Sequence, residues 1–377
     1  MQKYRVGFGH IEIGKTAKKY LKEALDRNWI SEGPNVKKFE EGFAKIYGYR
    51  HGIATSSGTD AGIVACAALL EQGAQRGDEV ITPALAFVAT ANCILAAGLA
   101  PKFVDVELDT LNINPSLLEA AIGPRTKAIQ AVHTMGKPCK MKPIMEIARR
   151  HQLAVIEDCC EAHGATLNGK VVGSFGAMGL FSFYAAHLIC SGEGGMISTN
   201  DPTFEALCRS IRTHGRRGGQ LYFHFDRVGF NSKMTDMAAA VGLEGLEMLD
   251  SNFKKRRRFL ARLHQLLSPL SDHLILYPDG PGEVVCPHAY PIVMRDADRS
   301  IDDLYQYLEK HGIQCKTLFG SLPTQHKAFE FMKIAKGTFP VAERIGRTGL
   351  HFGVHQYLKN EDIDFVADTI KSFFCRK

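Results

Sequence analysis

The chain alternates short apolar runs with longer segments in which apolar residues recur every three or four positions. The short runs, such as residues 51–57 (HGIATSS) and 153–160 (LAVIEDCC), predict buried β-strands. The longer segments, such as residues 58–73 and 141–152, predict helices that pack against those strands. Because this order repeats over roughly 200 residues, we expect an α/β fold with a mostly parallel sheet and helices on both faces.

The pattern changes after this region. Residues 235–267 predict one long helix that leads away from the sheet. A strand-like stretch and two helical stretches follow, at residues 288–294, 300–312 and 360–374. We therefore expect a large domain at residues 1–245, which includes an amino-terminal segment. A smaller α/β domain is expected at residues 246–377, beginning with the linking helix.

Composition is typical of an ordinary globular protein. Of the 377 residues, 45% are hydrophobic and 23% are charged. No apolar run approaches the ~20 residues of a membrane span, and the first residues lack the apolar core of a signal peptide. We expect a cytoplasmic protein without a membrane partner.

Cysteine spacing and charge argue against two further kinds of site. The ten cysteines include no C-x-x-C pair and no clustered set, so we expect reduced thiols, no metal site and no iron–sulfur cluster. The net charge is +6, and the basic run KKRRRF at residues 254–259 lies in a helical pattern without interleaved aromatic residues. We interpret this run as a solvated helix face and expect no nucleic-acid partner.

Polar residues or loops occur at four places where a predicted strand ends. They are the Ser56–Thr59 segment, the loop at residues 82–87, Asp158, and the loop that holds His187. Ligands of open α/β sheets bind beyond the carboxyl ends of the strands, so these signals predict a single pocket. In SSGT, a strand end is followed by a helix start, which predicts a phosphate cradle, although these residues are also ordinary helix caps.

Asp158 and Phe87 each allow two interpretations. A carboxylate just after a strand caps the next helix, or it pairs with a protonated ring nitrogen of a heteroaromatic cofactor. An aromatic residue in the same position of another strand packs in the core, or it stacks on such a ring. The residues by themselves leave both alternatives open.

Several stretches in order carry a family resemblance over nearly the whole chain. The sequence resembles the DegT/DnrJ/EryC1/StrS family of sugar aminotransferases. The resemblance implies an aspartate-aminotransferase-like fold (PLP fold type I), with pyridoxal 5'-phosphate or pyridoxamine 5'-phosphate as cofactor. It also implies a homodimer with shared active sites. The matching stretches are residues 29–48, 54–66, 77–107, 132–165, 173–200 and 229–250.

The resemblance assigns four residues to the cofactor phosphate. Gly58 and Thr59 would hold it through the start of their helix, and Ser182 of FSFY would add a hydroxyl. Asn231 of GFNSKM would reach the phosphate bound by the neighbouring subunit.

Three further residues are assigned to the cofactor ring. Phe87 would stack on the pyridine ring, and Asp158 would pair with its nitrogen, which keeps the ring protonated as an electron sink. Glu161 occupies the position where many relatives carry Gln beside the phenolic oxygen.

The chain departs from the family at one catalytic position. Aminotransferases of the family have a lysine at the third position after FSFY, in FSFYPTKN, and it forms the Schiff base with the cofactor. This chain has His187 there, and residues 171–200 contain no lysine. Imidazole forms no stable imine, but its ordinary pKa near ~6.5 lets it accept and donate protons.

This substitution favours a His-for-Lys subgroup that resembles GDP-4-keto-6-deoxymannose 3-dehydratase. Such an enzyme takes its amino group from L-glutamate and removes the C3 hydroxyl of a 4-keto-6-deoxy nucleotide sugar, with His187 as base. Two alternatives stay open: an aminotransferase whose Lys was replaced by His, and a pseudoenzyme that binds cofactor. The chain differs from this subgroup at Leu188, where the dehydratases carry a second His, and shows no evident substrate-loop pattern at residues 317–332.

Two further histidines have weaker expectations. His163 is expected to pack near the floor of the cofactor site. His214 begins a Gly- and Arg-rich loop, and with Arg216 or Arg217 it is a candidate to approach substrate phosphates.

Overall fold

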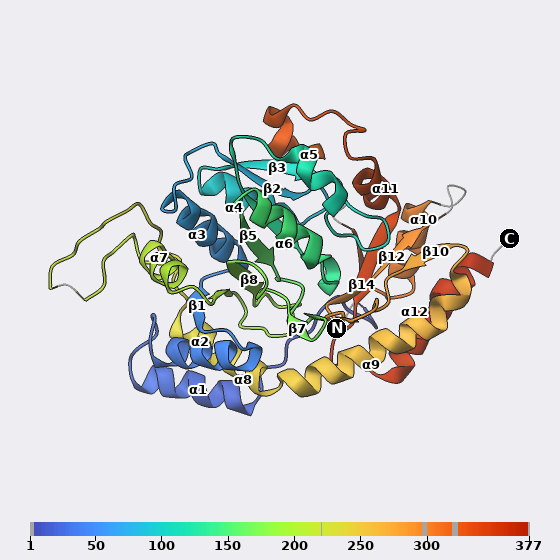
Figure 1. Cartoon of the computed structure of the whole chain (residues 1–377). Coiled ribbons are helices and arrows are strands. Elements are labelled where there is room, and N and C mark those ends of the chain that lie inside the picture. The colour runs from blue at the N-terminus through green and yellow to red at the C-terminus, as the bar shows by residue number, and fades with distance from the viewer. Residues whose placement is uncertain (1–3, 220, 296–299, 319–322, 376–377) are drawn as a thin grey trace.

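The computed structural model describes residues 4–219, 221–295, 300–318 and 323–375. Its large sheet has seven strands in the order β1-β9-β8-β5-β4-β2-β3 (Figure 1). Strand β9 is antiparallel to both of its neighbours, and the other strands all run in one direction. The predicted mostly parallel sheet is confirmed. The strands are β1 (His51–Thr55), β2 (Glu79–Pro83), β3 (Ala100–Val104), β4 (Thr126–Val132), β5 (Ala154–Asp158), β8 (Met178–Ser182) and β9 (Gly195–Thr199).

Successive strand residues point to opposite faces of this sheet, and each face is covered by helices. Val80 and Ala128 pack with one set, α3 (Gly58–Leu70), α4 (Val88–Ala96) and α7 (Pro202–Arg212). Their neighbours Ile81 and Ile129 pack on the other face with α5 (Leu118–Ala121) and α6 (Met141–Arg150). Burial on both faces explains why these strands are continuous apolar runs in the sequence.

Aromatic residues fill the core beside β8 and β9. Phe39 and Phe43 of α2 (Pro34–Tyr47) make edge contacts with Phe183 and Phe181 respectively. Helices α1 (Lys15–Asp26) and α8 (Asp236–Glu247) complete this region, and α1 packs on α8. A short hairpin is formed by β6 (Thr166–Leu167) and β7 (Lys170–Val171), and β11 (Glu283–Val284) pairs with β6.

The second sheet is antiparallel and lies beside the first (Figure 1). It packs on α9 (Leu249–Leu267), and Val6 belongs to the same apolar cluster. This smaller α/β unit confirms the predicted fold class. The predicted boundary after residue 245 falls within α8 and remains a prediction. Its elements are β10 (Leu274–Leu276), β12 (Ala289–Met294), β13 (Cys315–Thr317), β14 (Gly349–Gly353), α10 (Ile301–Lys310), α11 (Pro340–Thr348) and α12 (Asn360–Cys375).

Short 3-10 helices complete the list of elements. They are η1 (Pro115–Leu117), η2 (Thr134–Gly136), η3 (Ser268–Leu270), η4 (Pro323–Gln325) and η5 (Lys327–Met332). Of the stretch at 317–332, residues 319–322 lie outside the described residues. All ten cysteines are free thiols. Among the described helices, none is both long and apolar enough to cross a membrane.

Two predictions about residues 235–267 were wrong. The segment forms two helices, α8 and α9, which meet at Met248. The basic run within α9 is not a fully solvated face, because Arg256 is only 2% exposed. Consecutive helical residues are turned by about 100°, so a run of five basic residues surrounds the helix and one of them must face inward. Lys254, in contrast, is exposed as predicted.

A buried carboxylate joins β5 to the turn before β8. Glu157 is fully buried, and its Oε1 accepts hydrogen bonds from the backbone N–H groups of Phe175 and Gly176, both at 2.7 Å. Its Oε2 accepts from the N–H of Gly173 at 2.7 Å and lies 3.1 Å from Nε2 of His133. Charged acceptors make strong hydrogen bonds of this kind, so the network fixes the carboxyl end of β5.

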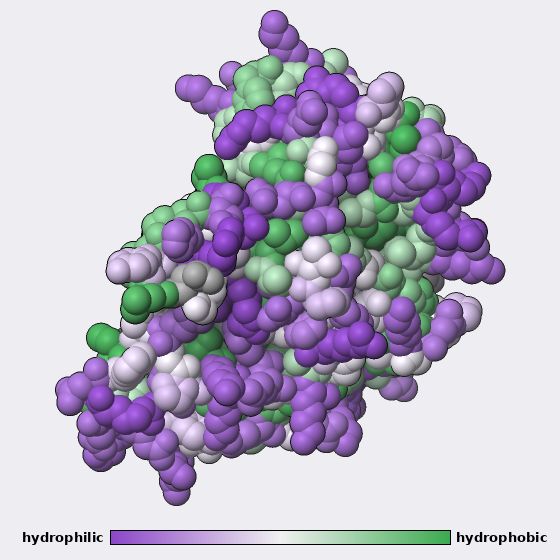
Figure 2. All heavy atoms as spheres, turned by 60° about the vertical axis from the view of Figure 1, so that its left-hand side comes forward, coloured by the Kyte–Doolittle hydropathy of each residue, from purple (hydrophilic) through white to green (hydrophobic). Residues whose placement is uncertain are grey.

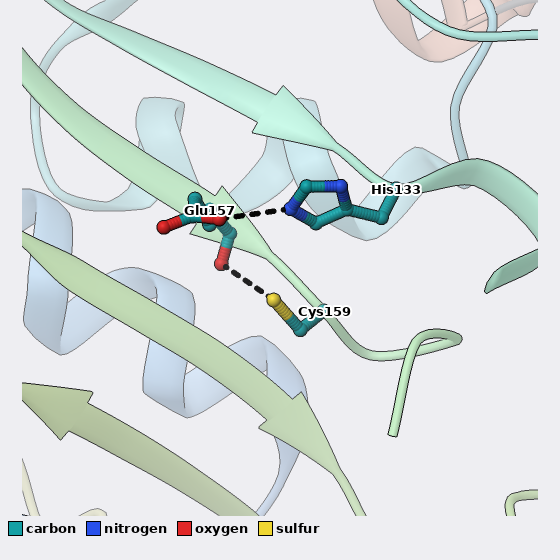
Figure 3. A group of neighbouring side chains, drawn as sticks. All are labelled: His133, Glu157 and Cys159. Carbon is teal, nitrogen blue, oxygen red and sulfur yellow. Dashed lines mark hydrogen bonds and ion pairs between the residues drawn. The ribbon is translucent and has the colours of Figure 1, made fainter. Parts of the chain in front are cut away.

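Cys159 lies beside this pair, and the three side chains have the composition of a metal site (Figure 3). Their contacts argue for a structural role instead. His133 uses its second ring nitrogen, Nδ1, to accept the N–H of Cys139 at 2.9 Å. Burial, with Glu157 as the next cause, raises the pKa of the Cys159 thiol well above its ordinary value. The ring and carboxylate are thus already engaged, and the thiol is held in its neutral form.

Replacing Glu157 by Gln tests this network. The amide keeps the size of the side chain, but its NH2 group faces N–H donors and leaves buried groups unpaired. We expect Glu157→Gln to lower the free energy of unfolding by about 2–4 kcal/mol, measured by urea denaturation. Glu146→Gln, at an exposed position of α6, is the matched control and should be neutral. Equal stability of the two variants would contradict this assignment.

Candidate active site

A cavity of about 730 Å³ opens at the carboxyl ends of the large sheet. Residues from the second sheet, including Lys316 and His351, close its other side. Asn231 is not among the residues that line it. The structure brings together the other predicted site residues in this one cavity, and they are Gly58, Thr59, Phe87, Asp158, Glu161, Ser182 and His187.

The start of α3 has the geometry of a phosphate site. Ser57 caps the helix, and its Oγ accepts the N–H of Asp60 at 3.0 Å. A Cβ atom on Gly58 would lie 2.7 Å from the Cβ of Ser182, so only glycine lets this helix end approach the end of β8. The unpaired N–H groups and positive dipole of a helix start attract an anion, and the Ser182 hydroxyl lies beside them.

Asp158 and Phe87 fit a flat, nitrogen-containing ring. Asp158 follows the anchored Glu157, and its Oδ2 accepts the Thr90 hydroxyl at 3.1 Å. Its Oδ1 accepts the N–H of Cys160 at 3.1 Å, so it also serves the local turn. Phe87 directly precedes α4 and is 61% exposed in the cavity wall rather than packed in the core. A carboxylate and an exposed aromatic face are the groups that a protonated pyridine ring needs.

Glu161 lies on the wall between the two sheets. Its Oε2 accepts the N–H of Met135 at 2.7 Å, and its Oε1 is 3.7 Å from Nε2 of His288. Burial, with a smaller contribution from Asp158, raises the pKa of Glu161 to about 7. Near neutral pH this carboxyl is therefore present in both forms, and it donates or accepts a hydrogen bond in the cavity.

His187 presents a neutral imidazole to the cavity. Burial lowers its pKa to about 3, and the neighbouring His163 and Arg256 contribute in the same direction. Among the described residues, none hydrogen-bonds to either ring nitrogen, and only Nδ1 is fully buried. The remaining nitrogen, Nε2, is thus free to accept a proton from a bound molecule.

Sequence reasoning missed three residues in or beside the cavity. His288 stacks on its ring, with centroids 4.9 Å apart and an interplanar angle of 27°. Arg256 of α9 donates from Nη2 to the His187 carbonyl at 3.2 Å. Lys316, on β13, is the one lysine among the described residues that line the cavity, and its Nζ lies 4.5 Å from the Phe8 ring. The basic run containing Arg256 was the only signal that could have drawn attention to one of them.

His163 packs behind the cavity wall. It is 1% exposed, and its Nε2 donates to the Ser182 carbonyl at 2.8 Å. Burial lowers its pKa to about 4, so the ring is neutral and can act as this donor. His163 thereby holds the end of β8, which carries the Ser182 hydroxyl.

The loop at residues 214–228 extends away from this cavity (Figure 1). Arg217 pairs with Asp226 at 2.7 Å, and Arg216 lies over the Phe223 ring at 4.1 Å. Neither arginine lines the cavity, and neither does His214. Figure 2, which turns this side forward, shows exposed apolar atoms among hydrophilic ones.

The raised pKa of Glu161 predicts a pH-dependent effect of Glu161→Gln. Because the folded-state pKa of about 7 exceeds the ordinary value of 4.5, ionisation destabilises the fold as pH rises between these values. Between pH 4 and pH 8 the variant should gain about 2–4 kcal/mol of unfolding free energy relative to wild type. Denaturant unfolding without added cofactor measures this, with Glu146→Gln as control. A difference that stays constant with pH would contradict the assignment.

The comparisons agree with this geometry. Residues 11–371 match the DegT/DnrJ/EryC1/StrS aminotransferase family. The chain is 37% identical to the GDP-perosamine synthase of Caulobacter vibrioides, over 93% of each chain. It is 32% identical to the dTDP-4-dehydro-2,6-dideoxy-D-glucose 3-dehydratase of Saccharopolyspora spinosa, over 94% of this chain and 84% of that enzyme.

A solved structure supports the cofactor assignment. The E. coli GDP-4-keto-6-deoxy-D-mannose-3-dehydratase with bound hydrated PLP has a TM-score of 0.89 to this chain at 27% identity. The match covers 97% of this chain and 99% of that one. The phosphate cradle at Gly58 and the wall formed by Asp158 and Phe87 fit the same group. The chain therefore belongs to the DegT/DnrJ/EryC1/StrS aminotransferase family, and its cofactor is pyridoxal phosphate.

Proposed function

We propose that the protein is a cytoplasmic 3-dehydratase of a 4-keto-6-deoxy nucleotide sugar. The observation that carries this proposal is the His187 imidazole, which lines the cavity where the sequence resemblance implies the Schiff-base lysine. When bound, pyridoxal phosphate supplies an amino group taken from L-glutamate and an electron sink for the reacting carbon.

Cofactor binding is assigned to residues of the large sheet. Asp158 would pair with the ring nitrogen, Phe87 would cover one ring face, and Glu161 would face the phenolic oxygen. Gly58 and Thr59, with the Ser182 hydroxyl, would hold the phosphate. No covalent bond to the protein is required in this arrangement, because these contacts hold both the ring and the phosphate.

His187 would move a proton in two steps. Its neutral Nε2 would accept a proton at the reacting carbon and would then pass that proton to the departing C3 oxygen. Burial, which lowers the pKa of His187 to about 3, keeps the ring neutral, and the neutral ring is the form that accepts a proton. Over one turnover the sugar loses its C3 oxygen, glutamate becomes 2-oxoglutarate, and the amino nitrogen leaves as ammonia.

Amino transfer is the second candidate function. The identity with the GDP-perosamine synthase favours it, and Lys316 supplies an amine in the cavity wall. Lys316 lies on the opposite sheet from His187, against the Phe8 ring. A protein that binds cofactor without catalysis is the remaining alternative.

We expect the wild-type protein, incubated with pyridoxal phosphate, glutamate and 4-keto-6-deoxy sugars carrying GDP or dTDP, to release ammonia and a 3-deoxy product. Mass spectrometry of the sugar distinguishes this product from an amino sugar. His187→Asn should lower the rate by at least about 100-fold while cofactor binding persists, because one proton carrier is lost. An amino sugar from the wild type would overturn the proposal, and inertness toward both nucleotides would favour the binding protein.

Two further variants locate any covalent link. His187→Lys should create a borohydride-trappable bond to the cofactor, which the wild type lacks. Lys316→Ala should leave the trapping behaviour of the wild type unchanged. Trapping on Lys316 in the wild type would contradict the noncovalent site.

We also propose that a second copy of the chain completes the site. Asn231 lies outside its own cavity, next to the loop at residues 214–228. That loop exposes large apolar side chains, as a surface covered by a partner does. The residues are Leu221, Tyr222, Phe223, Phe225 and Val228.

Mixing two defective variants tests this shared site. Asn231→Ala and His187→Asn are each expected to be impaired alone. Co-expressed at equal levels, they should recover about a quarter of wild-type activity, because half of the dimers would contain one intact site of two. Failure of the mixture to exceed either variant would contradict sharing of the site.

A further inference from the structure

The orientation of the His187 ring depends on packing rather than on hydrogen bonds. Its ring nitrogens have no partner among the described residues, as noted above. Its aromatic neighbours are His288 at 4.9 Å, Tyr184 at 6.1 Å and His163 at 6.0 Å between centroids. Only His288 lies nearly parallel to it, at 27°, so this ring defines the plane of the His187 imidazole.

The His288 side chain is held in place by Glu161. Its Nε2 lies 3.7 Å from Oε1 of Glu161, and the other oxygen of Glu161 accepts the N–H of Met135 at 2.7 Å. The His288 and Glu161 side chains are only 7% and 17% exposed. The ring is therefore confined between a fixed carboxyl group and His187.

The backbone before His288 is hydrogen-bonded to the Met135–Gly136 turn, which Glu161 also contacts. Cys286 donates its N–H to the Gly136 carbonyl at 3.0 Å, and the His288 N–H reaches the Cys286 carbonyl at 2.9 Å. The turn itself is unusual, since Met135 and Gly136 have φ angles of 53° and 80°. A Cβ atom at Gly136 would lie 2.3 Å from the Cys286 carbonyl oxygen, so glycine allows this close approach.

We propose that His288 is the positioning residue for His187. Its flat ring, fixed by the Met135–Gly136 turn through two independent connections, would hold the His187 imidazole in one plane for proton transfer by Nε2. This role rests on the proposed function of His187 as the proton carrier. Contacts of this kind matter because displacement of a reacting group by about 1 Å costs roughly 100-fold in rate.

Stacking also suits the protonated state of His187. A cation is stabilised over the face of an aromatic ring, and the Glu161 carboxyl lies 3.7 Å from Nε2 of His288. Arg256, which donates to the His187 carbonyl, acts in the opposite sense and lowers the pKa of His187. His288 thus contacts both the His187 ring and the Glu161 carboxyl.

The test compares His288→Ala with His288→Phe by two independent measurements. The first is the ring Cε1–H signal of His187 in the cofactor-free protein, identified by its loss in His187→Asn. Stacking shifts this signal upfield, and we expect the shift to persist in His288→Phe and to disappear in His288→Ala. The second is the steady-state rate of dehydration, where kcat should fall by about 10- to 100-fold in His288→Ala with little change in KM.

Controls separate positioning from general damage. His355 is 6% exposed and does not line the cavity, so His355→Phe tests the loss of another buried histidine and should change neither measurement. An unchanged signal in His288→Ala would overturn the proposal, and so would equal loss of kcat in the Ala and Phe variants. If the wild type forms no 3-deoxy sugar but the signal behaves as expected, the positioning of the ring stands and the dehydratase assignment fails.

Discussion

The buried carboxylate of Glu157 is the interaction on which the site depends. Three backbone N–H groups of the 173–176 turn and the His133 ring converge on it, and together they join β4, β5 and the approach to β8. Asp158 is the next residue. Because successive side chains of a strand point to opposite sides, the Asp158 side chain points away from that of Glu157 and toward the cavity. The hydrogen-bonded Glu157 carboxylate in the core thus positions the Asp158 carboxylate at the cavity.

The phosphate end and the reacting end of the cofactor site use different interactions. The phosphate end uses a helix start that glycine allows to approach β8 closely. The reacting end uses an imidazole that burial keeps neutral. In the proposed function, replacing an amine by an imidazole would remove a covalent attachment and retain proton transfer, so that noncovalent contacts would carry all of the cofactor binding. Family membership and site geometry agree on the cofactor, and the identity of residue 187 argues for the reaction.

Local sequence patterns predicted the strand ends well. Gly58, Asp158 and Ser182 follow apolar runs directly, and parallel strands bring such ends to one edge, so their meeting was predictable. The contributions of His288 and Arg256 were not, because both residues are distant in the sequence from His187 and the basic run around Arg256 was interpreted as a solvated helix face. The break at Met248 was also missed, since both helices share the same apolar period. Roles implied by the family resemblance, including that of Asn231, stay predictions.

The two sheets that bound the cavity differ in what they contribute. Residues such as Asp158 and His187 come from the large sheet, whereas Lys316 and His351 come from the antiparallel one. Mutation can therefore remodel Lys316 and His351 on the antiparallel wall while His187 and its neighbour His288, which directly precedes β12, stay unchanged. Such a division would let duplicated genes diverge toward new sugars by changes in one wall, and it gives protein engineers the same route.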